Sequence, residues 1–299
     1  MPASENSITA TFRLNGKLLS IIITDIPLDS QPGVGGIDSG TQYQLLKYTN
    51  LLTHYRSMRI AITGGANGIG LAISKIYASR GDSIVILDMN KGNLEEAKKN
   101  CDLIYAAVGK EAKCWILEND ITKKECALEF AEFCRSQMNG IDILILNAGI
   151  SLDYEFDDLG LDETDALFRQ IMEVNFFSNV RFVKTFSDLL FQSKGQLVIL
   201  SSGSGTLGIP RRSAYVASKH AVNGFFLSLR NEWIYQKRGV SITVICPSFV
   251  DTGIRRAAAL AGRAKDVVDP ESKKKMMTAD ECASKYLIDY FLRKKMERK

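Results

Sequence analysis

The feature that most constrains the fold is an alternation, from Arg59 onward, of short apolar runs with longer amphipathic ones. Six runs are apolar almost throughout, as strands buried on both faces of a sheet are: RIAIT, SIVILD, KCWILEND, DILILN, QLVILS and SITVICP. The stretches between them have helical spacing: residues 70–81, 93–100, 123–138 and 165–192. This pattern predicts an α/β fold, a doubly wound parallel sheet with helices on both faces.

The first 57 residues differ in kind, and we interpret them as an appendage to a single domain over residues 58–299. Asn15 and Gly16 lie between two β-rich runs and both accept positive φ, so this segment predicts a β-hairpin. A glycine-rich linker and a helix over residues 41–55 are expected to follow it. Near the other end, Thr278 and Glu281 predict a capping box for the last helix, after which no further strand is expected.

Composition narrows the range of partners. The formal net charge of the 299 residues is only +4, so nucleic acid is not an expected partner. The six cysteines have no paired spacing and there are two histidines, which predicts free thiols and no metal site. No apolar run approaches the roughly twenty residues of a membrane-spanning helix. Since the N-terminus has no signal or transit pattern, the expected location is cytoplasmic.

The first predicted strand runs into TGGANGIG, residues 63–70, and then directly into a helix. The glycines allow positive φ and let a diphosphate approach the backbone amides, while the helix N-terminus faces the negative charge. This segment therefore predicts a dinucleotide phosphate site. The G-x-G-x-x-G match over residues 203–208 does not, because proline and two arginines follow it in place of a helix.

Small or polar residues end the other strands as well. Asp88 ends the second strand, at the distance after the glycine turn where a carboxylate accepts hydrogen bonds from an adenosine ribose; a helix cap is the alternative. The next three strands end in similar residues: Asn119 and Asp120, Asn147 to Gly149, and Ser201 and Ser202. Because the carboxyl ends of parallel strands meet at one edge, these residues predict one site.

Six motifs in this order, TGGANGIG, NAG, VN, SS, YVASK and CPSFVDT, resemble the short-chain dehydrogenase/reductase family over about residues 59–290. The segment around YVASK most resembles the branch of hydroxysteroid dehydrogenases and microsomal-type carbonyl reductases. The resemblance implies a Rossmann sheet, a nicotinamide cofactor and a tetrad of Asn175, Ser202, Tyr215 and Lys219. The residues expected to contact the cofactor are Thr63, Gly64, Asn67, Gly68, Ile69, Gly70, Asp88, Asp120, Asn147, Ala148, Gly149, Tyr215, Lys219, Pro247, Val250 and Thr252.

The sequence departs from the family pattern in two places. CPS replaces the common Cys-Pro-Gly, which affects the expected loop beside the nicotinamide. Members of the family usually continue into another strand after the last helix. We therefore expect the sheet to lack that edge strand or to borrow one from residues 17–24.

Tyr215 and Lys219 lie one helical turn apart, a spacing that is not specific because residues 43 and 47, and 290 and 294, repeat it. A free phenol has a pKa near 10, so for Tyr215 to exchange a proton near neutral pH its pKa must fall by about three units, or roughly 4 kcal/mol. One cation about 4 Å away contributes on the order of 4 kcal/mol. We therefore expect Lys219 to lower the pKa of Tyr215. Ser202 is expected to fix the substrate oxygen.

Asn175 lies within the long predicted helix that precedes the fifth strand. By the family resemblance, a local distortion there would hold water that links Lys219 to solvent. The alternative is a buried polar residue that is satisfied by the backbone.

The expected function is the interconversion of a secondary alcohol and a ketone. The residues expected to contact the substrate are Ile150, Ser202, Leu207 and Phe249, and because three of them are apolar they favour a lipid-like, steroid-like or aromatic substrate. Residues 255–262 are expected to form a lid. NAD(H) is expected over NADP(H), because Asp88 would repel a 2′-phosphate. The alternative is a non-catalytic dinucleotide-sensing or scaffolding protein. The expected assembly is a homodimer through the long helices before the fifth strand and after Tyr215.

Overall fold

The computed structural model describes residues 7–14, 17–24, 56–253 and 276–285. The chain divides into two compact units, residues 1–55 and 56–299. In the first unit, β1 (Ser7–Leu14) pairs antiparallel with β2 (Lys17–Thr24), which confirms the predicted hairpin. The expected helix over residues 41–55 and the expected lid over residues 255–262 lie outside the described residues.

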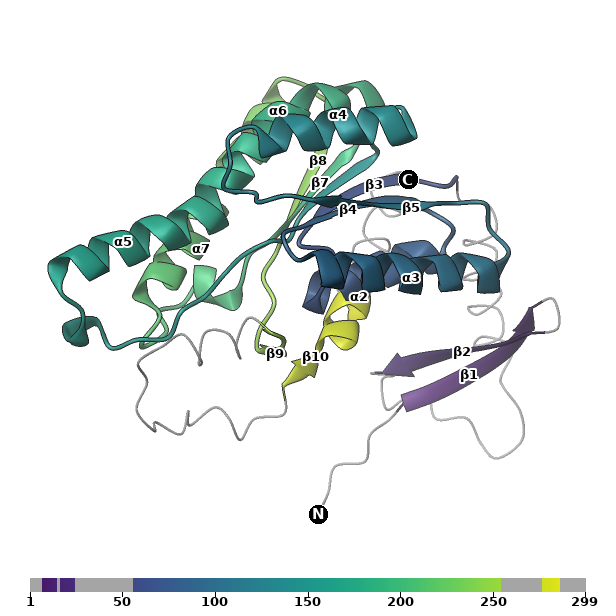
Figure 1. Ribbon diagram of the computed structural model, residues 1–299, viewed down its shortest axis with the longest axis horizontal. Helices are drawn as coiled ribbons and strands as arrows, with labels where there is room; N and C mark the ends of the chain where they lie inside the picture. The colour runs from purple at the N-terminus through teal and green to yellow at the C-terminus, as the bar shows by residue number, and fades with distance from the viewer. Residues whose placement is uncertain (1–6, 15–16, 25–55, 254–275, 286–299) are drawn as a thin grey trace, which may run out of the picture. The chain divides into compact units, whose positions relative to one another are not determined.

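The second unit is built on a parallel sheet with the strand order β5-β4-β3-β6-β7-β8 (Figure 1). Its strands are β3 (Arg59–Thr63), β4 (Ser83–Asp88), β5 (Cys114–Glu118), β6 (Ile143–Leu146), β7 (Gln196–Leu200) and β8 (Ser241–Ile245). All six predicted strands are present. The chain leaves β3 to form β4 on one side and later β6 on the other, so the order reverses at β3, where open α/β sheets bind ligands.

Helices cover both faces of the sheet, which confirms the doubly wound prediction (Figure 1). They are α2 (Gly68–Ser79), α3 (Lys91–Val108), α4 (Cys126–Met138), α5 (Leu161–Met172), α6 (Ser178–Ser193) and α7 (Ser213–Tyr235). Successive side chains of a strand point to opposite faces. Ile60 and Ile62 of β3 therefore join the core under α2 and α3, whereas Ala61 joins the core under α4, α6 and α7.

The end of the described chain adds a strand that the sequence did not predict. β10 (Met277–Thr278) pairs in parallel with β9 (Val250–Asp251), and a helix follows over residues 279–285. The predicted capping box is confirmed: Glu281 Oε2 accepts from the Thr278 amide at 2.7 Å, and Thr278 Oγ1 accepts from the Glu281 amide at 3.1 Å. In the described ranges the order of the six-stranded sheet runs from β5 to β8, and β2 is paired with β1.

Two aspartates hold β3 to its neighbours at the amino ends of the strands. Asp142, just before β6, accepts from the Arg59 amide at 2.9 Å and forms a two-pronged ion pair with the Arg59 guanidinium, at 3.0 and 2.9 Å. Asp82, just before β4, accepts from the Met58 amide at 2.8 Å and pairs with Arg80. Both contacts fix the register at the end of the sheet opposite the predicted site.

The substitution Asp142→Asn is expected to lower the free energy of unfolding by about 2 kcal/mol at pH 7, because it removes the countercharge of the partly buried Arg59. Burial opposes ionisation of Asp142, but the hydrogen bonds and charge of Arg59 outweigh it and hold its pKa below the ordinary value. The carboxylate therefore stabilises the fold above the unfolded pKa of about 3.9, and this contribution is lost as the pH falls through the lower folded pKa.

Urea unfolding followed by circular dichroism, from pH 7 downward, measures this difference. Asp165→Asn is the matched control, since it removes an exposed ion pair with Arg169 and should leave the unfolding midpoint unchanged. If the difference in the free energy of unfolding between wild type and Asp142→Asn stayed constant below pH 4, the stabilising role of the ionised Asp142 carboxylate would be contradicted.

Candidate active site

The glycine turn joins β3 to α2 at the switch point of the sheet. Gly64 and Gly68 have φ values of +63° and +52°, which L side chains rarely adopt. Asn67 caps α2, since its side-chain oxygen accepts from the Gly68 amide at 2.7 Å. The first turn of α2 carries no acidic side chain, so an anion at this helix N-terminus would meet no like charge there. The turn therefore fits the diphosphate of a dinucleotide.

The glycine turn packs closely against the segment that follows β6. A Cβ on Gly70 would lie 2.1 Å from the Gly64 carbonyl oxygen and 2.5 Å from Asn147 Nδ2. Asn147 Nδ2 in turn donates to the same carbonyl at 2.8 Å, and a Cβ on Gly64 would lie 2.9 Å from Ala148 Cα. Thr63 Oγ1 accepts from the amides of both Asn147 and Ala148 at 3.2 Å. The structure thus brings these predicted cofactor residues together.

Asp88 lies beside the glycine turn at the end of β4. Its Oδ2 accepts from the Ala66 amide at 3.4 Å and its Oδ1 from the Asn90 amide at 3.2 Å. The cap of α3 is Asn90, whose side chain accepts from the Asn93 amide at 2.9 Å, so the alternative role of Asp88 as that helix cap is not observed. Its position leaves Asp88 available to a ribose at the turn.

The remaining predicted cofactor residues lie around this turn or in neighbouring loops. Thr252 Cγ2 lies 3.5 Å from where a Cβ on Gly68 would be, so the segment after β8 reaches the turn. The Pro247 carbonyl accepts from the Gly203 amide at 2.8 Å, and Val250 lies in β9. Ile69 packs on the core under α2 and α3. Asp120 accepts from the amide and hydroxyl of Thr122 at 2.9 and 2.8 Å.

Ser202, Tyr215 and Lys219 come together from two elements. Ser202 lies just after β7 and Tyr215 in the first turn of α7, close enough for the Ser202 hydroxyl to act on the pKa of Tyr215. Lys219 is buried one turn further along, donates to the Leu200 carbonyl at 2.9 Å, and lies 5.7 Å from the Tyr215 ring centroid. The adjacent Ser201 instead bonds the Lys219 carbonyl at 3.5 Å. Of the two serines, Ser202 is therefore the one that acts on the Tyr215 hydroxyl.

The electrostatics of this cluster differ from the sequence-based expectation. Burial raises the pKa of Tyr215, while the neighbouring Ser202 hydroxyl and the charge of Arg212 oppose the rise. Burial lowers the pKa of Lys219 to about 8. The expected lowering of the Tyr215 pKa by Lys219 is wrong for the chain by itself, because desolvation is the largest effect and the ammonium is directed at the Leu200 carbonyl.

Asn175 lies in the distortion that the sequence predicted, a π-helical turn over Glu173–Phe177 between α5 and α6. The side chain is fully buried and is satisfied as in the alternative interpretation. Its Oδ1 accepts from the Ile150 amide at 2.8 Å, and its Nδ2 donates to the Ile150 carbonyl at 2.9 Å and to Ser218 Oγ at 3.0 Å. Its predicted role in holding water stays a prediction.

The backbone between the cofactor side and the tetrad is also closely packed. A Cβ on Gly149 would lie 3.1 Å from Asn175 Oδ1 and 3.7 Å from Lys219 Nζ.

On the expected substrate side, Ile150 packs against a small cluster formed by Tyr154, Ile171 and Ala214. Leu207 is 65% exposed, and the Phe249 carbonyl accepts from the Met277 amide at 3.1 Å. Tyr154, at the centre of this cluster, is marked by no motif in the sequence.

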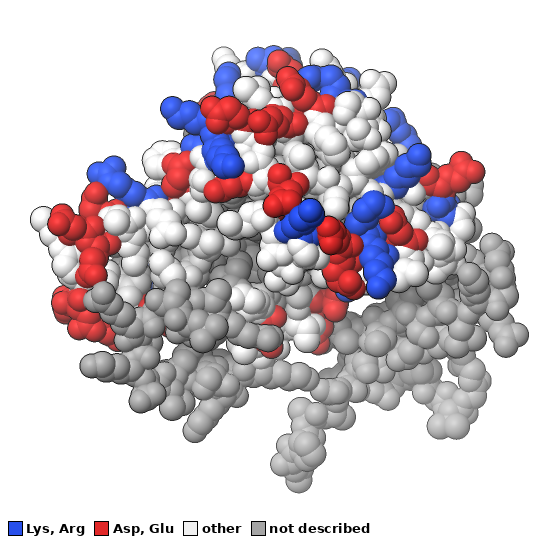
Figure 2. Space-filling view, viewed as in Figure 1, with Lys and Arg blue, Asp and Glu red and all other residues white. Residues whose placement is uncertain are grey.

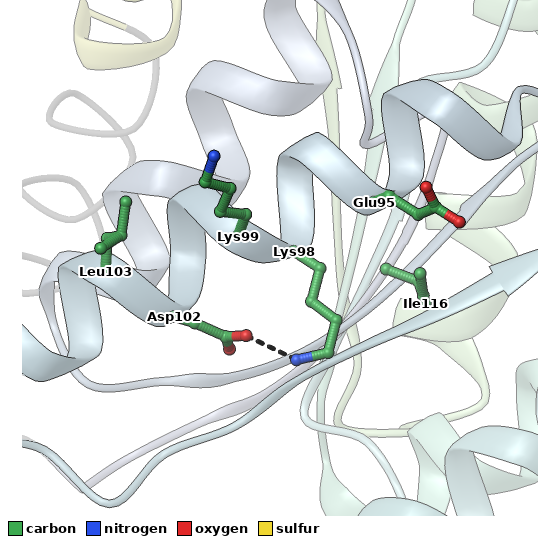
Figure 3. Close-up of a pocket in the computed structure, with 6 residues that line it drawn as sticks. All are labelled: Glu95, Lys98, Lys99, Asp102, Leu103 and Ile116. Carbon is green, nitrogen blue, oxygen red and sulfur yellow. Dashed lines mark hydrogen bonds and ion pairs between the residues drawn. The ribbon is translucent and has the colours of Figure 1, made fainter.

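A groove of about 420 Å³ lies elsewhere, between α3 and β5 (Figure 3). On the α3 side of the groove, Lys98 and Asp102 form an ion pair at 2.6 Å. No tetrad residue and no residue of the glycine turn lines this groove, so it is not the candidate active site.

Other classes of site find no support in the described residues. In the ranges that the structure covers, no group of three His, Cys, Asp or Glu side chains could hold a metal ion, and no described helix is long and apolar enough to cross a membrane. On the face shown in Figure 2, basic and acidic side chains are interspersed.

The fold and the site define a dinucleotide-binding α/β protein with a Ser–Tyr–Lys cluster at the carboxyl edge of its sheet. The family model for short chain dehydrogenases matches residues 58–261. The chain belongs to this family of oxidoreductases, which bind NAD(P).

The relatives support the predicted branch. A "Dehydrogenase/reductase SDR family protein 7-like" of Dictyostelium discoideum is 32% identical over 78% of this chain and 71% of its own length. "Dehydrogenase/reductase SDR family member 7B" of Mus musculus is 29% identical over 73% and 66%. A "Hydroxysteroid 11-beta-dehydrogenase 1-like protein" of Xenopus tropicalis is 31% identical, with 65% of each chain covered. The predicted resemblance to the hydroxysteroid dehydrogenase-like branch is confirmed.

Two solved structures show the same fold. An alcohol dehydrogenase from Thermococcus sibiricus complexed with 5-hydroxy-NADP superposes with a TM-score of 0.62 at 23% identity, over 77% of this chain and 89% of its own. A short chain dehydrogenase/reductase from Burkholderia phymatum in complex with NAD gives a TM-score of 0.66 at 22% identity, over 79% and 87%.

The packing of the glycine turn predicts the effect of adding one methyl group. Gly70→Ala is expected to abolish dinucleotide binding and to lower the melting temperature, because the new Cβ would overlap the Gly64 carbonyl and force the turn away from Asn147. Gly92→Ala in α3 is the control, since its Cβ would meet only Asn90 Oδ1 at 3.5 Å. Calorimetric titration with NAD and thermal melting measure both effects; retained affinity in Gly70→Ala would place the dinucleotide elsewhere.

Proposed function

We propose that the protein interconverts a secondary alcohol and a ketone by hydride transfer with a nicotinamide dinucleotide, with Tyr215 as general acid/base. The observation that supports this most directly is the meeting of three side chains: Lys219 is buried one turn along α7 with Nζ 5.7 Å from the Tyr215 ring centroid, and Ser202 lies close enough to Tyr215 to lower its pKa. The hydroxyls that would hold a substrate oxygen and exchange its proton therefore belong to the same cluster. Family membership favours this function and gives no support to a non-catalytic scaffold.

The chain supplies the proton chemistry of the reaction. When bound, the dinucleotide provides or accepts the hydride at the substrate carbon. Ser202 hydrogen-bonds the substrate oxygen, and Tyr215 gives a proton to that oxygen in reduction or takes it in oxidation. With the dinucleotide bound, a charged Lys219 would stabilise the tyrosinate formed in reduction, since its Nζ lies 5.7 Å from the Tyr215 ring centroid.

The residues that would hold the dinucleotide lie on both sides of the glycine turn. The amides at the start of α2 would bind the diphosphate, and Asp88 would accept hydrogen bonds from the adenosine ribose. Asn147 to Gly149 and Thr252 would line the path towards Tyr215 and Lys219.

We propose an apolar, lipid- or steroid-like carbonyl as the substrate. Ile150 lies in a small apolar cluster directly after the glycine of NAG, and the exposed Leu207 follows Ser202 by five residues. The hydroxysteroid dehydrogenase-like relative points to the same substrate class.

A homodimer is the proposed assembly. The helices expected to form the interface carry exposed apolar side chains that a second copy of the chain would cover: Phe177 in the π-turn, and Leu227, Ile234 and Tyr235 in α7. The Phe176 and Phe225 rings, 5.9 Å apart, join the two helical segments beneath them. A cytoplasmic location stays a prediction from the sequence.

The acid/base role predicts a loss of turnover without a loss of cofactor affinity. Tyr215→Phe is expected to lower kcat by about 10³-fold, since the phenyl ring keeps its packing but cannot transfer a proton. The measurement is the absorbance of the reduced cofactor with a panel of apolar ketones and secondary alcohols.

Two adjacent serines provide a matched pair for the same assay. Ser202→Ala is expected to lower kcat strongly, whereas Ser201→Ala removes only a bond to the Lys219 carbonyl and should leave kcat almost unchanged. Wild-type turnover that persists in Tyr215→Phe would refute the proposed mechanism.

We also propose that NAD(H) is preferred over NADP(H) by at least about tenfold in kcat/KM, a difference of about 1.4 kcal/mol. Asp88 hydrogen-bonds the Ala66 amide within the glycine turn, where a 2′-phosphate would meet its negative charge at close range. The next residue, Met89, is uncharged and 72% exposed, so it would offer such a phosphate no cation.

Kinetics with both cofactors test this preference in wild type and in the double variant Asp88→Ala, Met89→Arg. The double variant is expected to reverse the preference, because it removes the carboxylate and adds a cation. A wild-type enzyme that already prefers NADPH would show that Asp88 does not contact the ribose.

A further inference from the structure

The helix that carries Tyr215 begins without a cap of its own. Arg212 is the N-cap residue of α7, and its side chain makes no capping hydrogen bond. The Val216 amide donates to the Arg212 carbonyl at 2.8 Å, so the amides of residues 213–215 precede the first bond of the helix ladder. Because Tyr215 lies in this uncapped first turn, its position depends on whatever holds the turn in place.

Tyr154 supplies the missing acceptor from another part of the chain. Its hydroxyl oxygen accepts from the Ala214 amide at 2.8 Å and lies 2.8 Å from Ser213 Oγ. Since the oxygen already accepts from Ala214, the phenolic hydrogen is available to Ser213. The Tyr154 side chain is 5% exposed and packs against Ile171 and Ala214, so the hydroxyl is held at the start of α7.

Further contacts join the same two segments. The Tyr154 amide donates to the Arg211 carbonyl at 3.0 Å. The Arg211 Nε atom lies 2.9 Å from Asp153 Oδ1 and 3.2 Å from Glu155 Oε1. Arg211 has a φ of +64°, a backbone conformation that is energetically unfavourable for any residue other than glycine. These contacts hold Arg211 in that conformation. Residues 153–155 therefore bind residues 211–214 through backbone and side chains.

We propose that Tyr154 is a positioning residue whose hydroxyl caps the first turn of α7 and so fixes Tyr215 beside Ser202. The inference rests on the proposed function for its catalytic consequence, but the capping contact itself does not. It also links the two sides of the site, because Ile150, four residues before Tyr154, is held by Asn175. The segment expected to line the substrate side is thereby fixed to the helix that carries the acid/base residue.

The variant Tyr154→Phe tests the proposal, because it removes the hydroxyl and keeps the ring. Tyr105→Phe is the matched control: Tyr105 is 4% exposed, and its hydroxyl donates to the Asp82 carbonyl at 2.6 Å, at the opposite end of the sheet. The two variants lose one buried hydroxyl each, and only Tyr154→Phe uncaps α7. Ser213→Ala is a milder variant, since it keeps the bond from the Ala214 amide to Tyr154.

The first measurement is amide hydrogen exchange in peptides that cover residues 211–218, which needs no substrate. Exchange in the first turn of α7 is expected to be about tenfold faster in Tyr154→Phe, slightly faster in Ser213→Ala and unchanged in Tyr105→Phe. Unchanged exchange in Tyr154→Phe would overturn the proposal.

The second measurement separates positioning from a purely structural role. The kcat of Tyr154→Phe is expected to fall by about tenfold while the KM for the dinucleotide stays the same, because the glycine turn is untouched. Faster exchange with the kcat of the Tyr105→Phe control would also overturn the proposal. A wild-type protein without turnover would contradict the proposed function, and hydrogen exchange would then decide on the capping role by itself.

Discussion

The close approach of two backbone segments, made possible by glycines, is the constraint on which the rest of the site depends. Gly64 and Gly70 leave room for the Asn147 side chain, and a Cβ on either would collide with backbone. The contact continues through Ala148 to Gly149, which lies against Asn175 and Lys219. A continuous series of close contacts therefore runs from the expected diphosphate position to the buried lysine, so the segment Asn147 to Gly149 packs against both the glycine turn and the tetrad.

The hydrophobic pattern predicted the architecture, because six short runs that are apolar almost throughout must be buried on both faces, as the strands of a doubly wound parallel sheet are. The strands β3 and β4 end where their apolar runs end. The others are shorter than predicted, since residues such as Asn119 and Asp120 turn out of the sheet to make local hydrogen bonds. A two-residue strand such as β10 has no period to detect, because its pairing with β9 depends on where two distant segments meet.

The residue types of the candidate site and their order along the chain could be predicted from the sequence, but the contacts between them could not. The Asn175 distortion was predicted, but its partners at Ile150 and Ser218 depend on packing between elements far apart in sequence. The pKa of Tyr215 was predicted in the wrong direction, because helical spacing gives the distance of a cation but not the desolvation of the phenol. Tyr154 carries no sequence signal at all, since its role arises only when its loop meets the start of α7.

The π-helical turn at Glu173–Phe177 has a consequence for how this chain can vary in length. Each helical residue turns the chain by about 100°, so removing one residue here would rotate everything after it by that angle relative to α5. Phe182, Phe186 and Leu190, now buried under the sheet, would turn out of the core while α5 kept its own orientation. A deletion of one codon is therefore not compatible with such a segment, so gaps in this stretch should be absent from functional variants of the chain.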